Sequence, residues 1–121
     1  MKRSEPLAFK HCDIQTSSDG QTQINLDVTY NAKHLSLSGE GNGPVDATKS
    51  ALLNTVSEFT VQAYNEHALD QKGSESTAIA YMQVERDGRC HYGVGIDPNI
   101  SIASIKAMIS ALNALDSGES I

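Results

Sequence analysis

The chain is short of basic residues, cysteines and long apolar runs, and each shortage excludes a class of function. It has 9 lysines and arginines against 15 aspartates and glutamates, for a formal net charge of −6. That balance argues against binding to nucleic acid or to an anionic membrane surface. No apolar run is long enough for a transmembrane span, and no apolar segment follows the basic start as it would in a secretory signal. The two cysteines show no metal-ligand or redox spacing, so we expect a reduced, cytoplasmic protein.

Motifs of catalysis and metal binding are also missing. The sequence has no Gly-x-Ser-x-Gly, no His-Glu-x-x-His and no glycine-rich loop ending in Lys-Ser or Lys-Thr. The pairs His11-Cys12 and Cys90-His91 would form a metal site only if their strands paired, and adjacent residues of a strand point to opposite faces. We therefore expect no catalytic residue, no metal and no cofactor in this chain.

The first half of the sequence predicts three strands and a helix. An irregular strand is expected over residues 7–17, a half-buried strand over residues 24–30, and a short strand around residues 35–37. The helix is expected to begin at Pro44, because the missing N–H of proline costs nothing at the first helical position.

The second half repeats this order. Alternating apolar residues predict strands over residues 59–63, 78–84 and 92–96, with a polar loop over residues 70–75. A helix follows over residues 102–112, for which Ser101 is the expected cap. The predicted fold class is therefore α+β, with two pseudo-symmetric βββα units packed together, each a short antiparallel sheet with one helix.

The 121 residues, 39% of them hydrophobic, suffice for one folded domain with a modest core. The expected organisation is an N-terminal tail over residues 1–6, a single domain over residues 7–115 made of units 7–57 and 58–115, and a C-terminal tail over residues 116–121.

Two glycine-rich stretches, residues 39–47 and 93–103, lie where a strand is expected to give way to a helix. A helix N-terminus reached through glycine can present backbone N–H groups to an anion. The alternative is a tight turn that requires positive φ. Asp46 and Asp97 beside these turns either compensate the helix dipole or bind an ammonium group. The alanines of the last helix form a small-residue stripe that permits close approach to a sheet or to another helix.

Six segments together carry a family resemblance from about Leu7 to Leu115. They are Gly-Asn-Gly-Pro-Val-Asp-Ala at 41–47, Tyr-Asn-Glu-His-Ala at 64–68, Ala-Ile-Ala-Tyr at 78–81, Gly-Val-Gly-Ile at 93–96, Ala-Ser at 103–104 and Ser-Ala-Leu-Asn at 110–113. In this order and spacing the chain resembles the C-terminal regulatory domain of 2-isopropylmalate synthase.

The resemblance implies two βββα units, a homodimer, and allosteric feedback inhibition by L-leucine bound between the units. The family's catalytic part is a separate (β/α)₈ barrel, which uses a divalent metal and acetyl-CoA for a Claisen-type condensation. This chain has no barrel and no His-x-His metal motif, so we expect either an excised regulatory domain or a stand-alone copy, without synthase activity. The implied partners are leucine, a second copy and the catalytic barrel, with no nucleic acid and no membrane.

The resemblance also implies an effector pocket on the first glycine turn, the fourth and fifth strands and the second turn. Its residues are Gly41, Asn42, Gly43, Val45, Val61, Tyr64, Ala68, Ala78, Ala80, Asp97, Pro98 and Ile100. Ser76 stands where relatives often have alanine, which affects the loop-side wall of the pocket. Helix N-termini would bind the leucine carboxylate, turn carbonyls with Asp97 its ammonium group, and valines with alanines its side chain.

Three alternatives stay open at this point. Because one methylene is worth only about 1–3 kcal/mol in an apolar slot, the effector is either leucine or, as in the related domain of citramalate synthase, isoleucine. The second alternative is a dimerisation module that binds no ligand. A small enzyme that holds a phosphorylated substrate on its glycine turn is the third alternative, disfavoured by the acidic charge and the missing lysine.

Overall fold

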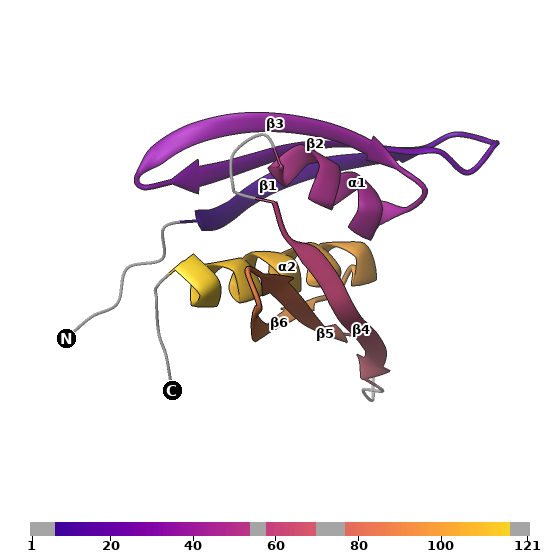
Figure 1. The fold of residues 1–121 in the computed structure, drawn as a ribbon. Helices are drawn as coiled ribbons and strands as arrows, with labels where there is room; N and C mark the ends of the chain where they lie inside the picture. The colour runs from indigo at the N-terminus through magenta and orange to yellow at the C-terminus, as the bar shows by residue number, and fades with distance from the viewer. Residues whose placement is uncertain (1–6, 54–57, 70–76, 117–121) are drawn as a thin grey trace. The chain divides into compact units, whose positions relative to one another are not determined.

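The computed structural model describes residues 7–53, 58–69 and 77–116, which form two three-stranded antiparallel sheets, each followed by one helix (Figure 1). The predicted α+β class, with the order βββα twice, is confirmed. The chain divides into two compact units, Met1–Ser57 (unit 1) and Glu58–Ile121 (unit 2).

Unit 1 consists of β1 (Leu7–Thr16), β2 (Thr22–Tyr30), β3 (Lys33–Gly41) and α1 (Pro44–Leu52), with β2 central in the sheet. The predicted alternation on β2 is confirmed, because Ile24, Leu26 and Val28 are buried and face the side that α1 covers. Pro44 is the first helical residue, as expected.

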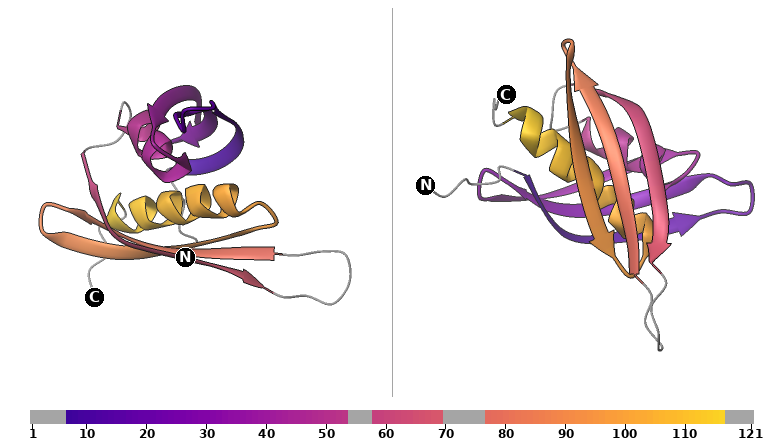
Figure 2. Two further views of the ribbon diagram at one scale, coloured as in Figure 1. Left: turned by 90° about the vertical axis from the view of Figure 1, so that its right-hand side faces the viewer. Right: turned by 90° about the horizontal axis from the view of Figure 1, so that it is seen from below.

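Unit 2 consists of β4 (Thr60–Leu69), β5 (Thr77–Arg86), β6 (Arg89–Asp97) and α2 (Ile100–Asp116), with β5 central. The inward face of β5 is buried, and α2 lies across this face of the sheet (Figure 2). Asp87 and Gly88 join β5 to β6 with φ of 54° and 78°, the combination that a two-residue hairpin turn of type I′ requires.

The expected simple alternation at the start of β4 is wrong. A bulge lies between Val61, which pairs with Val84, and Ala63, which pairs with Gln83. The extra residue moves each later side chain of β4 to the opposite face of the sheet. Tyr64 therefore pairs with the buried Met82 and lies on the same face. Without the bulge, Tyr64 would point to the opposite side of the sheet.

The glycine-rich stretches do lie where a strand gives way to a helix, as expected, but four of their glycines belong to the strands and not to the turns. Gly39 and Gly41 lie within β3, Gly93 and Gly95 lie within β6, and among the described glycines only Gly20 and Gly88 have positive φ. A Cβ atom on Gly39 would lie 2.4 Å from the carbonyl oxygen of Ala47, and one on Gly95 would lie 2.1 Å from that of Ala103. The glycines therefore serve close packing, with each unit's alanine-rich helix against its own strand.

The predicted cap of the second helix is also wrong. The side-chain oxygen of Asn99 accepts hydrogen bonds from the backbone N–H groups of Ser101 (2.8 Å) and Ile102 (3.2 Å). Asn99 is thus the N-cap, and the helix begins two residues earlier than its apolar pattern indicated. Val56, the loop over residues 70–75, Ser76 and the residues beyond Asp116 lie outside the described ranges. Among the described residues, no helix combines the length and the apolarity needed to cross a bilayer.

Candidate functional site

The start of α1 is an uncapped helix N-terminus. Gly43 is the N-cap, with an extended backbone (φ 172°, ψ 174°) and no side-chain hydrogen bond. Its carbonyl accepts the N–H of Ala47 at 2.9 Å, and the carboxylate of Asp46 accepts the N–H of Asn42 at 3.1 Å. Within the described part of the chain, no side chain caps the N–H groups of Val45 and Asp46, so this corner has donors for an external acceptor.

The start of α2 is closed by the protein's own side chains. Besides the Asn99 cap, the Asp97 carboxylate accepts the N–H of Asn99 and a hydrogen bond from the Lys106 ammonium, each at 2.9 Å. Burial alone would raise the pKa of Asp97, but the Asn99 N–H and the Lys106 charge outweigh it and lower that pKa. Asp97 is therefore already neutralised by a partner, which weakens its expected role as an ammonium acceptor.

A partly uncovered strip runs along β4 in unit 2. Helix α2 packs over β5 and β6 and makes little contact with β4. On the helix-facing side, Ala78 and Ala80 of β5 are buried, whereas Val61 is half-buried and Tyr64 is 40% exposed. The apolar surface that this strip exposes therefore comes from Val61 and the ring of Tyr64, since the two alanines are covered.

A hydrogen-bonded cluster lies near the middle of this strip. The Tyr64 hydroxyl lies 2.5 Å from the Ser104 hydroxyl and donates to the Glu66 carboxylate, while Ser104 also donates to the carbonyl of Ile100 at 3.0 Å. Burial, followed by the hydrogen bond to Glu66, raises the pKa of Tyr64. The cluster provides a carboxylate beside an apolar surface, which is the environment that an ammonium group needs.

Glu66 and Ser104 were absent from the residues expected at the site. The signal was available, because Glu66 lies two residues after Tyr64 on a strand and Ser104 lies four residues after Ile100 on a helix. Both spacings place a residue on the same face as its predicted neighbour.

The remaining expected site residues have the following places. Gly41 ends β3, and a Cβ atom there would lie 2.7 Å from both the Asp46 carboxylate and the backbone nitrogen of Ala47, so the residue also has a packing role. Ala68 pairs with Ala78 in the sheet. Pro98 is exposed between β6 and α2, and Ile100 is the exposed first residue of that helix.

The histidine and cysteine pairs do not meet on paired strands. His11 and Cys12 lie on β1, which pairs with β2, whereas Cys90 and His91 lie on β6, which pairs with β5. Among the residues with described positions, no group of three or more histidines, cysteines, aspartates or glutamates is placed to hold a metal ion.

Comparison with known families gives a match over almost the whole chain. Residues 1–115 match the family model described as the LeuA allosteric (dimerisation) domain.

Individual relatives agree with this match. The chain is 41% identical over 99 residues to a 2-isopropylmalate synthase of Thermobifida fusca, covering 82% of this chain and 17% of the relative. It is 40% identical over 108 residues to that of Clostridium acetobutylicum (87% and 19%) and 37% identical over 110 residues to that of Helicobacter hepaticus (88% and 20%). The chain thus spans about a fifth of the length of these curated relatives.

Proposed function

Since the chain belongs to the family of LeuA allosteric (dimerisation) domains, we propose that it is the effector-binding domain of a 2-isopropylmalate synthase and that its effector is L-leucine. Binding of leucine inhibits the catalytic barrel by feedback, and the domain works as a homodimer. The chain itself performs no condensation and holds no cofactor. We expect a cytoplasmic location, because the two cysteines of the sequence show no metal-ligand or redox spacing.

The difference between the two helix starts carries the proposal. Asn99 and Asp97 close the start of α2, whereas Gly43 leaves the N–H groups of Val45 and Asp46 at the start of α1 without a side-chain acceptor among the described residues. A free carboxylate accepts such N–H groups and gains from the helix dipole. We therefore assign the leucine carboxylate to the turn of Asn42, Gly43 and Val45.

Unit 2, taken by itself, has two features along β4 that suit a free amino acid. Val61 and the Tyr64 ring offer apolar surface, and burial of an isobutyl group contributes roughly 2 kcal/mol. Glu66, in the cluster with Tyr64, offers a charged acceptor for an ammonium group. The other residues that the family resemblance implies stay predicted contacts of the effector, each within its own unit: Gly41 in unit 1, and Ala68, Asp97, Pro98 and Ile100 in unit 2.

Isothermal titration calorimetry of the chain with leucine and with isoleucine tests the proposal. We expect saturable heat with leucine, weaker binding of isoleucine, and a melting temperature that rises with leucine concentration. At a leucine concentration 100-fold above Kd, the gain in unfolding free energy is about 2.7 kcal/mol. A folded sample that gives no heat with either amino acid at millimolar concentration contradicts the proposal and leaves a ligand-free dimerisation module.

Two substitutions of Gly43 test the carboxylate contact. A Cβ atom at Gly43 meets nothing within 4 Å, so both variants should fold. Gly43→Asp places an acidic N-cap on α1, which stabilises the helix but occupies its N–H groups and repels a carboxylate. We expect it to abolish leucine heat without lowering the melting temperature, whereas Gly43→Ala keeps most of the affinity. Equal affinity in the two variants would place the carboxylate elsewhere.

A further inference from the structure

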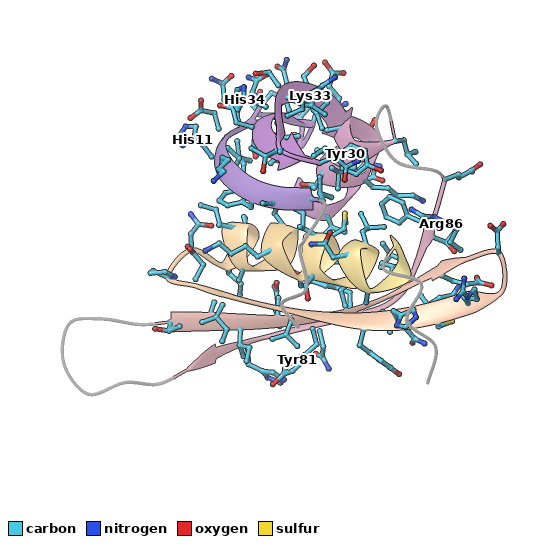
Figure 3. All side chains as sticks on the ribbon, turned by 90° about the vertical axis from the view of Figure 1, so that its left-hand side faces the viewer. His11, Tyr30, Lys33, His34, Tyr81 and Arg86 are labelled. Atoms are coloured by element: carbon cyan, nitrogen blue, oxygen red, sulfur yellow. The ribbon has the colours of Figure 1, made fainter. Side chains whose placement is uncertain are left out.

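The outer face of unit 2, the side of its sheet that points away from α2, is apolar and exposed. The residues that define it are Ala63, Ile79, Tyr81, Tyr92, Val94 and Ile96. Tyr81 points away from the helix (Figure 3), and the exposed fractions are 42% for Tyr81, 70% for Tyr92, 45% for Val94 and 53% for Ile96. Cross-strand pairing joins Tyr81 to Val94 and Ile79 to Ile96, so these side chains form one continuous surface.

The equivalent face of unit 1 is polar. The inward-facing glycines show which positions of the two units correspond. Gly39 of β3 pairs with Ile24 of β2, and Gly93 of β6 pairs in the same way with Met82 of β5. It follows that Ser38 corresponds to Tyr92, Glu40 to Val94 and Gln23 to Tyr81. His11 and His34 extend from the outer side of the unit-1 sheet (Figure 3). The same supersecondary unit is therefore stable with a polar outer face, and folding alone does not account for the aromatic and aliphatic residues of unit 2.

Charge indicates what covers the face. The chain carries a formal net charge of −6, so two copies repel each other overall, and a contact surface without charged residues adds least to that repulsion. The three central cross-strand rows of the outer face of unit 2 are Ala63–Gln83–Tyr92, Asn65–Tyr81–Val94 and His67–Ile79–Ile96, without Asp, Glu, Lys or Arg. Unit 1 instead presents Asp13, Asp27 and Glu40 outward, where two copies would bring like charges together.

The face also has the relief that a self-complementary contact needs. A shallow hollow of about 180 Å³, lined in part by Tyr81, Tyr92 and Asn65, lies beside the most exposed side chain of the face. A two-fold contact presents each copy's projecting residues to the other's hollow, because the same patch is used on both sides. Tyrosine suits such a contact, since it buries a large ring and keeps its hydroxyl group at the wet rim.

We propose that a second copy of this chain covers the outer face of unit 2 and forms a two-fold homodimer through Tyr81, Tyr92 and Val94. The inference names the surface of the homodimer in the proposed function and rests on it, and the matching family is described as a dimerisation domain. The rest of a longer protein is the other possible occupant, because the relatives are about five times as long as the matched region. Their flanking parts would leave this chain monomeric when it is studied alone.

The test is the oligomeric state of the 121-residue chain, measured by sedimentation equilibrium over a range of concentrations. Val94→Glu installs at the centre of the face the residue that unit 1 carries at the corresponding position, Glu40, so the fold accommodates it. We expect the wild type to dimerise and Val94→Glu to raise the dimer Kd by at least roughly a hundredfold, because each two-fold contact buries two like charges. Ser38→Glu adds the same charge to the outer face of unit 1 and should leave the dimer Kd unchanged.

A second variant removes the contact without adding charge. Tyr92→Ser also copies its unit-1 counterpart, and we expect the dimer Kd to rise roughly tenfold or more. A wild-type Kd in both variants, or a monomeric wild type at all concentrations, overturns the inference. The heat of leucine binding is measured separately from the dimer Kd. If Val94→Glu weakens the dimer but the chain binds no amino acid, the proposed effector is contradicted and the dimer surface is supported.

Discussion

A Cβ atom placed on Gly93 would lie 2.1 Å from the carbonyl oxygen of Ala107. Strand β6 and helix α2 therefore meet through backbone atoms, and no side chain can be inserted between them. The relation recurs in unit 1, where a Cβ atom on Gly39 would lie 2.4 Å from the backbone nitrogen of Ala51. Both units thus depend on glycine opposite alanine for the distance between helix and sheet.

Gly93→Ala is accordingly expected to destabilise unit 2 severely. The added methyl group meets helix backbone rather than a flexible side chain, so α2 must move and its buried face must repack. We expect a loss of about 3 kcal/mol or more in the unfolding free energy, measured by urea denaturation. Gly43→Ala, with open space around the new methyl group, should cost no more than about 1 kcal/mol. Equal losses in the two variants would contradict the packing role.

Asn99→Ala should destabilise α2, whereas Ser101→Ala should not. The Asn99 side chain satisfies the backbone N–H groups of Ser101 and Ile102, and loss of such a cap costs about 1 kcal/mol. Thermal unfolding of the two single variants distinguishes them. A larger loss of thermal stability for Ser101→Ala than for Asn99→Ala would show that Ser101, as the sequence pattern predicts, is the cap.

The ion pair between Asp97 and Lys106 gives a specific dependence of stability on pH. The pKa of Asp97 is lower in the folded than in the unfolded chain, so its contribution is complete above about pH 4 and is lost as the pH falls through the folded-state value. Because the Lys106 side chain is 36% exposed, the pair is worth at most about 1 kcal/mol.

The unfolding free energy of the wild type minus that of Asp97→Asn, measured from pH 7 to pH 2, should therefore shrink as the solution is acidified. A difference that stays constant or grows towards acid pH would show that the carboxylate charge does not stabilise this corner.

Tyr64→Phe tests the cluster on β4. The pKa of Tyr64 is raised in the folded protein, first by burial and then by Glu66, so the contribution of its hydroxyl group is complete below about pH 10 and is lost above it. We expect the phenol to ionise later than an exposed tyrosine in an ultraviolet titration, and the late component to vanish in Tyr64→Phe. The substitution should cost about 1 kcal/mol at neutral pH.

The sequence predicted the elements well where their period was regular. The β5 residues Ala78, Ala80, Met82 and Val84 alternate strictly and are all buried, because a sheet covered on one face imposes a period of two. The prediction was wrong at the start of β4, where a bulge shifts the period by one residue. A bulge leaves no mark in an apolar pattern unless the partner strand is known.

The candidate site was predicted less completely. The resemblance named Tyr64 but neither Glu66 nor Ser104, which share its hydrogen bonds. It also treated the start of α2 like the start of α1, although Asn99 and Lys106 close the second corner. Which side chains reach which backbone groups depends on the crossing of helix and strand, and local sequence does not specify that crossing.

The amino-acid sequence alone determined the order of strands and helices, the internal duplication and the family, because hydrophobic period and residue spacing act locally along the chain. Only the tertiary structure decided that the glycines in β3 and β6 let a helix pack closely on the strand and do not form turns. Glycine permits both a positive φ and a close backbone approach, and the difference between them exists only once the helix lies on its strand.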